Sequence, residues 1–427
     1  MYTSVGEYDE AREHPEKALA IKKEISDRNG EADCYVWFGT MHLSVDEYGK
    51  AREHFEKSLE IRKEIGDRIG EAACYGMLGG VPYRSVGEFE KARELLEKSL
   101  SIKKDVGDTD GEAECYGSLA VTYQSVGEYD NAIEHLKKAL MIKRKNGAKQ
   151  GVRKCCYNLA VAFHRRGKYP KAIEYIKEAL IIASETGHRA GKAASLLFHG
   201  FILYSIGGYA AKAKEYCREA IAISKEIGLR KTQAQCYFVL GHVLFEEGEY
   251  CKAEEHFKKS LEISQDIGDI SGQFQSLQTL ARVRFKEGKN QEATSYLLTA
   301  IEKCEKIRGS LRDNDQWKIS FTNSNMSSYH NLCRLLCETG NPQAALYVSE
   351  LGKARALADL MSAQYSVKNQ VFANPQTWSG IESIMDRERN CSCLYVSDSL
   401  DTIYFWILKR GGLTQFCDIK GKELSAS

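Results

Sequence analysis

The hydrophobic and polar positions of this chain repeat every 40 or 41 residues over its first three quarters. In one repeat, Tyr116, Leu119 and Tyr123 fall at i, i+3 and i+7, the spacing of one face of an α-helix. A second stretch begins with Ala132 and Leu136 and places an alanine, a large residue and then a small residue on one face. The pattern therefore predicts a helical hairpin in every repeat.

Glycines mark the turns of these hairpins. The recurring phrase at the turn within a unit begins at Gly6, Asp46, Gly87, Gly127, Gly167, Gly207, Gly248 and Gly288, and more distantly at Gly340. Between units, Gly66-Asp67 and its equivalents predict a left-handed helix end followed by an N-cap. Small residues in the first helix allow the second helix to approach closely, as at Gly39, Gly79, Gly200 and Gly241. Since one hairpin cannot bury its apolar face alone, the period predicts stacked hairpins.

These residues resemble the tetratricopeptide repeat, whose pattern is Trp-x2-Leu-Gly-x2-Tyr followed by Ala-x3-Phe. The resemblance covers residues 1–307 in about eight units, the first incomplete, and a looser ninth unit near residues 323–355. It implies an all-α, right-handed solenoid of 40-residue hairpins, and the longer repeat is also similar to those of the Pins/LGN adaptors. Pro15 and Pro82 depart from the pattern and should kink or fray their helices. Because the first unit lacks its leading helix, we expect the chain to be a piece of a longer protein.

The sequence pattern changes after residue 307. Residues 308–364 are expected to hold a linker, the ninth repeat and a junction helix around residues 350–360. β-branched and aromatic residues over 393–397 and 402–408, with a turn at residues 410–412, predict a β-hairpin. The junction and this hairpin resemble the start of a CHAT domain, a caspase-like fold. Residues 365–427 are therefore interpreted as the N-terminal part of a truncated CHAT-like α/β domain.

Charge and hydropathy exclude several classes of protein. The 60 Lys and Arg residues nearly balance the 59 Asp and Glu residues, so the net charge of +1 argues against binding to nucleic acid or to an anionic membrane surface. The longest apolar stretch, near residues 196–209, is shorter than the roughly 20 residues that a membrane span needs. Met1 is followed directly by repeat sequence rather than by a signal peptide, which predicts a cytoplasmic protein.

The cysteines and histidines do not indicate catalysis. Cysteine occupies one position of successive repeats, with Ser195 in the remaining one, which predicts a packing role at Cys34, Cys74, Cys115, Cys155 and Cys236. Cys391 and Cys393 have no histidine nearby, so we expect no metal site there. His330 is the last histidine, and a Cys-His dyad cannot form after it. The sequence predicts a protein that is not an enzyme and that has no metal and no cofactor.

The first helices of the fifth to eighth units carry side chains that the packing pattern does not use. These are Tyr157, Asn158, His164, Arg165, Phe198, Phe201, Tyr204, Phe238, His242, Phe245, Arg282 and Phe285. We expect them to form a concave groove that binds a partner's peptide or helix with apolar anchors and acidic side chains. The sequence therefore predicts a protein-protein interaction scaffold. The alternative for each of these aromatic side chains is packing between neighbouring hairpins.

Two other functions stay open. The first is a sensor or regulatory arm of a CHAT-type cysteine peptidase, which requires a histidine and a cysteine on strand ends beyond Ser427. The second is a Pins/LGN-type polarity or G-protein signalling adaptor, and the predicted strands after residue 390 argue against it. The partner's identity and the oligomeric state do not follow from the sequence.

Overall fold

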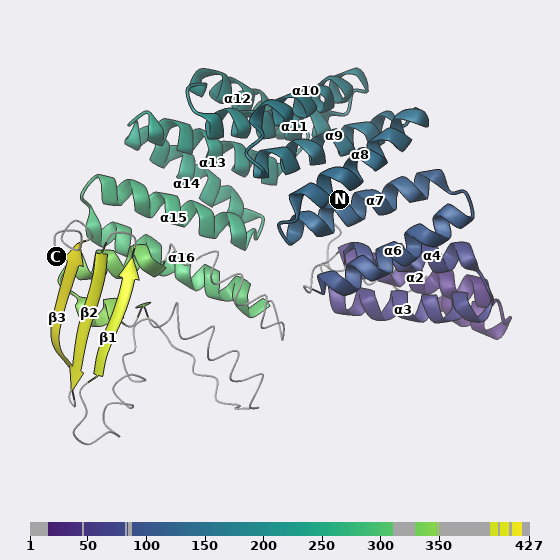
Figure 1. Ribbon diagram of the computed structural model, residues 1–427, viewed down its shortest axis with the longest axis horizontal. Coiled ribbons are helices and arrows are strands. Elements are labelled where there is room, and N and C mark those ends of the chain that lie inside the picture. The colour runs from purple at the N-terminus through teal and green to yellow at the C-terminus, as the bar shows by residue number, and fades with distance from the viewer. Residues whose placement is uncertain are drawn as a thin grey trace. The chain divides into compact units, whose positions relative to one another are not determined.

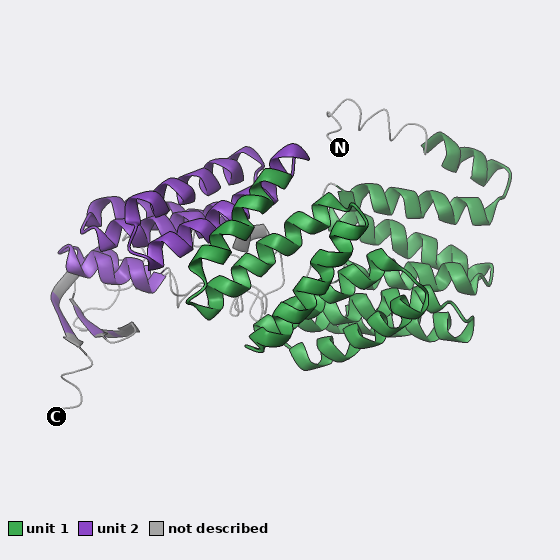
Figure 2. Ribbon diagram, turned by 90° about the horizontal axis from the view of Figure 1, so that it is seen from above, with its two compact units in different colours: residues 1–223 green, residues 224–427 purple. Residues whose placement is uncertain are grey.

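The computed structural model describes residues 16–44, 47–81, 83, 88–310, 329–346, 348–349, 393–399, 402–409 and 412–420. The chain folds into two compact units, Met1–Ile223 and Ser224–Ser427 (Figure 2). Pro15, Pro82, Cys391 and the junction helix predicted at residues 350–360 lie outside the described residues. The domain limits predicted at residues 307 and 364 stay predictions.

The first unit is built from antiparallel helical hairpins (Figure 1). After the helical residues 16–24, the pairs are α2 (Arg28–Ser44) with α3 (Tyr48–Glu64), α4 (Arg68–Gly80) with α6 (Phe89–Asp105), α7 (Thr109–Ser125) with α8 (Tyr129–Lys145), α9 (Lys149–Arg165) with α10 (Tyr169–Glu185), and α11 (Arg189–Ile206) with α12 (Ala210–Glu226). The last of these helices ends in the second unit. The helical hairpins predicted from the repeat are confirmed over the described part of this range.

The second unit continues the hairpins and adds a sheet. Its elements are α13 (Arg230–Glu246) with α14 (Tyr250–Asp266), α15 (Ile270–Lys286) with α16 (Asn290–Ser310), helical residues 329–338 and 342–346, and the strands β1 (Cys393–Ser399), β2 (Thr402–Lys409) and β3 (Gly412–Lys420). The sheet is antiparallel in the order β1-β2-β3. The predicted hairpin of β1 and β2 is confirmed. The sequence pattern did not predict β3, because the polar residues Thr414, Gln415 and Asp418 interrupt its apolar positions.

Three turns between hairpins combine a left-handed glycine with a capping aspartate, at Gly66-Asp67, Gly107-Asp108 and Gly268-Asp269. Gly66 has a φ of 70°, a conformation that residues with a side chain rarely adopt. The carboxylate of Asp67 then accepts a hydrogen bond of 2.9 Å from the backbone N–H of Gly70 in the first turn of α4. The same arrangement recurs at Gly268 and Asp269. The helix ends predicted from these Gly-Asp pairs are confirmed.

Within a hairpin, a small residue of the first helix meets a large residue of the second. A Cβ atom added to Gly39 would lie 2.5 Å from the Phe55 ring, and one added to Gly241 would lie 2.6 Å from the Phe257 ring. Real Cβ atoms essentially never approach other atoms so closely, so neither position has room for a side chain. The close helix approach predicted from these glycines is confirmed.

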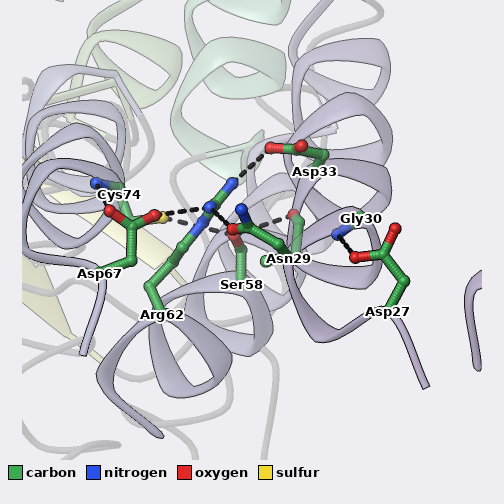
Figure 3. Close-up of polar contacts among 10 residues, drawn as sticks. Asp27, Asn29, Gly30, Asp33, Ser58, Arg62, Asp67 and Cys74 are labelled. Carbon is green, nitrogen blue, oxygen red and sulfur yellow. Dashed lines mark hydrogen bonds and ion pairs between the residues drawn. The ribbon is translucent and has the colours of Figure 1, made fainter. Parts of the chain in front are cut away.

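The repeated cysteine contacts a serine of the preceding hairpin (Figure 3). The Ser58 hydroxyl donates a 3.0 Å hydrogen bond to the carbonyl oxygen of Ala32, and the Cys74 thiol donates to Ser58 Oγ at 3.4 Å. The Cys115 thiol donates to Ser99 Oγ at 3.3 Å in the next hairpin. Cysteine in this position therefore fixes how one hairpin lies on the next, as the sequence pattern predicts, and the described cysteines are not in disulfides.

A buried arginine adds a polar contact between two hairpins. Arg62 of α3 is only 8% exposed, and its guanidinium donates to Asn29 and Asp33 of α2. It also forms a 2.6 Å ion pair with Asp67, the residue that caps α4 (Figure 3). One side chain thus connects α2, α3 and the start of α4.

The sheet packs against the helical residues 329–346 of the second unit. Trp406 of β2 is fully buried, and its indole N–H donates a 2.8 Å hydrogen bond to the carbonyl oxygen of Pro342. Tyr404 joins the same hydrophobic cluster, which includes Tyr329 and Leu332. The ninth hairpin and the strands therefore share one core. No helix in the described part of the chain is long and apolar enough to cross a membrane.

The contact between Gly241 and Phe257 predicts the effect of one added methyl group. Changing Gly241→Ala should lower the stability of the second unit by about 1 to 3 kcal/mol, because the methyl group overpacks the hairpin. Gly117→Ala is a matched control in a helix interior, since no atom lies within 4 Å of its added Cβ. It should be neutral or stabilise by up to about 1 kcal/mol. Urea unfolding followed by circular dichroism measures both, and equal midpoints for the two variants would contradict the prediction.

Candidate interaction surface

In the first unit, the predicted aromatic side chains of α9 and α11 lie together. We call Tyr157, His164, Phe198, Phe201 and Tyr204 the α9–α11 aromatic surface. Ring centroids are 5.6 Å apart for Tyr157 and Phe198, 5.1 Å for His164 and Phe201, and 6.4 Å for Phe201 and Tyr204. All five side chains are half-buried, so each still presents part of its ring to solvent.

The polar residues around the aromatic surface are only partly available. The imidazole of His164 shares a 3.0 Å hydrogen bond with Ser205 Oγ, and burial together with Arg165 lowers the pKa of His164. The ring is therefore neutral at pH 7. The backbone carbonyl of Asn158 accepts a 3.2 Å hydrogen bond from the Gln124 amide, whereas Arg165 is exposed. The surface is thus aromatic, with the exposed Arg165 next to His164.

In the second unit, four of the predicted residues line one cavity of about 550 Å³, the α13–α15 cavity. They are Phe238 and His242 of α13 and Arg282 and Phe285 of α15. The rest of the lining comes from α15, α16 and the helical residues 329–338, as Gln275, Gln278, Thr279, Ala281, Lys286, Ala293, Leu297, Asn331, Arg334 and Leu335. The volume falls in the range of about 300 to 1,000 Å³ that is typical of ligand-binding pockets.

Positive charge dominates the α13–α15 cavity. Arg282, Lys286 and Arg334 line it, and no Asp or Glu is among its described lining residues, although Arg282 forms a 3.0 Å ion pair with Glu246 outside the lining. The Arg334 guanidinium lies 4.9 Å from the centroid of the Phe285 ring, a cation-π contact that holds the charge over an apolar wall. Such a site suits a ligand that combines carboxylates with apolar groups.

Phe245 does not belong to the exposed surface, which corrects the predicted site. Its side chain is 8% exposed and packs in a core cluster with Phe257. The Tyr250 ring lies 5.2 Å away, and the Arg282 guanidinium covers the other side at 4.1 Å from the ring centroid. Helical periodicity predicts the same face for Phe245 as for the surface residues, because it does not separate half-buried from buried positions. The Phe245 ring therefore packs against the Arg282 guanidinium rather than contacting a partner.

Sequence reasoning missed the contribution of the ninth hairpin. Asn331 and Arg334 line the α13–α15 cavity from the helical residues 329–338. The repeat register weakens after residue 307, and the first-helix positions of the ninth unit were not assigned. Counting back from Gly340 by the repeat spacing identifies Asn331 and Arg334 as first-helix positions. Within the described residues, no group of three or more His, Cys, Asp and Glu side chains could hold a metal ion.

The burial of Phe245 predicts that it contributes to stability rather than to direct binding. Phe245→Ala should destabilise the protein by about 3 to 5 kcal/mol, the range for removing a buried aromatic ring. Phe201→Ala changes a half-buried ring of the α9–α11 aromatic surface, and its effect should be less than half as large. Chemical unfolding of the two variants measures the difference, and a smaller effect for Phe245→Ala would contradict its place in the core.

His242 predicts a pH dependence of stability. Burial, followed by the charge of Arg282, lowers the pKa of His242 to about 4, whereas an unfolded histidine has a pKa of about 6.5. Between these values the unfolded chain binds a proton that the folded chain does not, so stability falls as the pH drops from 6.5 to 4. His242→Gln should remove about 1 to 3 kcal/mol of that loss. Unfolding curves at pH 7 and 4.5 test this, and an unchanged pH dependence in the variant would contradict it.

Family models agree with the repeat seen in the sequence and the structure. Models of the tetratricopeptide repeat match residues 1–64, 34–105 and 83–145, then residues 155–190, and then residues 234–267. Together these matches cover about half of the chain. Tetratricopeptide repeat protein 28 of Homo sapiens and of Mus musculus is 32% identical over 127 residues, which is 29% of this chain and 5% of that protein. The match therefore spans a small part of these relatives.

Solved structures with the same fold are more distant in sequence. Aspartyl phosphate phosphatase F from Bacillus subtilis aligns with a TM-score of 0.56 and 19% identity over 67% of this chain and 73% of its own. The Rap conjugation gene regulator of the plasmid pLS20, in complex with the Phr* peptide, aligns with a TM-score of 0.52 and 16% identity over 68% of this chain and 78% of its own. From its repeat spacing, its hairpins and the family models, the chain belongs to the tetratricopeptide-repeat family.

Proposed function

We propose that this chain is a non-catalytic interaction scaffold that binds a peptide or helix of a partner protein. The observation that carries the proposal is the α13–α15 cavity, where first-helix side chains of two hairpins and the ninth hairpin converge. Four of the residues that the sequence predicts for a binding surface meet there. The α9–α11 aromatic surface is a second contact region of the same kind.

The chemistry of the cavity defines the proposed partner. Phe238 and Phe285 offer apolar contact, while Lys286 and Arg334 supply positive charge without a neighbouring acid in the described lining. A partner segment with one or two large apolar side chains and nearby acidic residues matches both features. The Rap regulator of pLS20 has the same fold and was solved with a bound peptide, which agrees with this proposal at the level of the fold alone.

One observation favours a second function, that of a regulatory arm for a CHAT-type peptidase. The sheet follows the ninth hairpin and shares its core through Tyr404 and Trp406. A conformational change in the hairpin would therefore alter the packing of the strands. In this case the repeats bind the partner and the segment after them responds. The sequence resemblance over residues 347–364 and 391–417 supplies the CHAT interpretation, and residues beyond Ser427 would have to supply the catalytic groups.

A peptide selection tests the proposed function. Random twelve-residue peptides displayed on phage are selected against the full chain, and enriched peptides should combine large apolar side chains with Asp or Glu. Phe238→Ala with Phe285→Ala should weaken the binding of an enriched peptide by about 1 to 4 kcal/mol, as expected for interface anchors. Lys286→Gln with Arg334→Gln should weaken the binding of acidic peptides. The effect should be smaller for the same peptides with Asn and Gln in place of Asp and Glu, because only the charge contacts are lost.

Lys225→Gln is the control for this experiment, since Lys225 is exposed on α12 and does not line the cavity. It should leave peptide affinity unchanged. Circular dichroism confirms that each variant keeps its helices. If no peptide is enriched, or if the selected peptides bind the two double variants as well as the original chain, the α13–α15 cavity is not the binding site.

A further inference from the structure

A second cavity, of about 640 Å³, lies in the first unit between α10, α11 and α12. It shares no residue with the α9–α11 aromatic surface or with the α13–α15 cavity. Its lining is formed by Tyr169, Pro170, Ile173, Lys177, His199, Leu203, Ile206, Tyr209, Lys212 and Tyr216. We call it the α10–α12 cavity. Its volume lies in the range that is typical of ligand-binding pockets.

His199 occupies a position that is apolar in the other hairpins. Counting four residues on from the repeated cysteine or serine gives Phe38, Leu78, Leu119, Leu159, Leu240 and Leu280 elsewhere, all of them buried. His199 is buried as well, at 3% exposure, yet its Nδ1 atom has no hydrogen-bond partner among the described residues. A buried polar atom without a partner destabilises a fold. His199 therefore departs from the packing rule of the repeat at the edge of the cavity, a departure that is expected at functional sites.

The second helix of the same hairpin also departs from the repeat. Cys217 stands where the other hairpins have Phe55, Leu96, Leu136, Ile176, Phe257 and Leu297. A Cβ added to Gly200 would lie 3.0 Å from the Cys217 sulfur, the counterpart of the contact between Gly241 and the Phe257 ring. The α11–α12 hairpin thus buries a smaller side chain at its closest approach. Both departures occur in the hairpin that borders the cavity.

The charges and rings of the lining define what the cavity can bind. Lys177 and Lys212 contribute two ammonium groups, and no Asp or Glu is found among the described lining residues. The Tyr216 ring stacks on His199 with centroids 4.5 Å apart. Ile206 and Tyr209 are exposed at 36% and 51% and present apolar surface. The cavity therefore offers flat apolar walls beside two positive charges.

The protonation of His199 agrees with an anionic ligand. Burial, followed by the charges of Lys177 and Lys212, lowers the pKa of His199 to about 4. The ring is neutral at pH 7, and a neutral imidazole can donate a hydrogen bond from one nitrogen. A negatively charged oxygen at this place would accept that hydrogen bond and compensate both lysines.

We propose that the α10–α12 cavity binds a small aromatic molecule that carries an anionic group, with Lys177, Lys212 and His199 as its polar contacts. The aromatic body matches the tyrosine and isoleucine side chains, and the anion matches the two ammonium groups. This inference is independent of the proposed peptide binding, because the two sites share no residue. Neither site's failure would therefore count against the other.

Calorimetric titration of the full chain at pH 7 with naphthalene-2-carboxylate tests the proposal. Naphthalene-2-carboxamide has the same shape without the charge and should bind at least tenfold more weakly. Lys177→Gln with Lys212→Gln should weaken binding of the carboxylate at least tenfold. Lys137→Gln with Lys252→Gln changes lysines at the same two helix positions in other hairpins and should leave affinity within twofold.

His199→Leu introduces the residue that most other hairpins have at this position. It should abolish binding of the carboxylate and, at the same time, raise the thermal midpoint of the free protein, because the unpartnered nitrogen is gone. The lysine variants are at exposed positions and decide the outcome even if His199→Leu does not fold. The proposal is overturned if the carboxylate does not bind, if carboxylate and carboxamide bind equally, or if the paired Lys177 and Lys212 changes leave affinity intact.

Discussion

Every hairpin of this protein depends on how closely its two helices approach. At Gly39 and Gly241 the first helix has no side chain, and the ring of Phe55 or Phe257 fills the space against its backbone. Close packing of this kind fixes which face of the first helix is turned to the second. The side chains on the remaining face are then not needed for the hairpin itself. The proposed binding surface follows from this constraint, because it consists of side chains that face away from the closest helix contact.

Polar contacts set the register between neighbouring hairpins. The Cys74 thiol and the Ser58 hydroxyl connect three helices through two hydrogen bonds, and Arg62 connects the same helices through Asn29, Asp33 and Asp67. Buried charged contacts contribute little net stability because desolvation offsets their attraction. Their directionality, in contrast, allows only one relative placement of the helices. We infer that apolar contacts hold each hairpin together and that these polar groups determine how it stacks on the next.

The sequence predicted the parts of the structure that repetition makes visible. The hairpins, the capped turns at Gly66-Asp67 and the cysteine register recur often enough for the pattern to be unambiguous. The pattern gave a wrong prediction for Phe245 and none for Arg334. Phe245 was placed on the surface because a helical period cannot resolve its burial, and Arg334 was missed because the register fades in the ninth hairpin. The strand β3 lacks a clear apolar alternation, and its pairing with β2 decides its conformation.

The two candidate sites differ in what they demand of the fold. The α13–α15 cavity uses first-helix positions at the edge of the hairpin core, where Phe238 and Phe285 pack against core clusters while also lining the cavity. The α10–α12 cavity uses one position that the other hairpins fill with leucine or phenylalanine, and there His199 leaves a buried nitrogen without a hydrogen-bond partner among the described residues. A repeat protein supplies its own reference for such a comparison, because the same position is seen several times in one chain. A position that breaks the packing rule once, at the edge of a cavity with unopposed charge, is therefore stronger evidence for a ligand than the cavity alone.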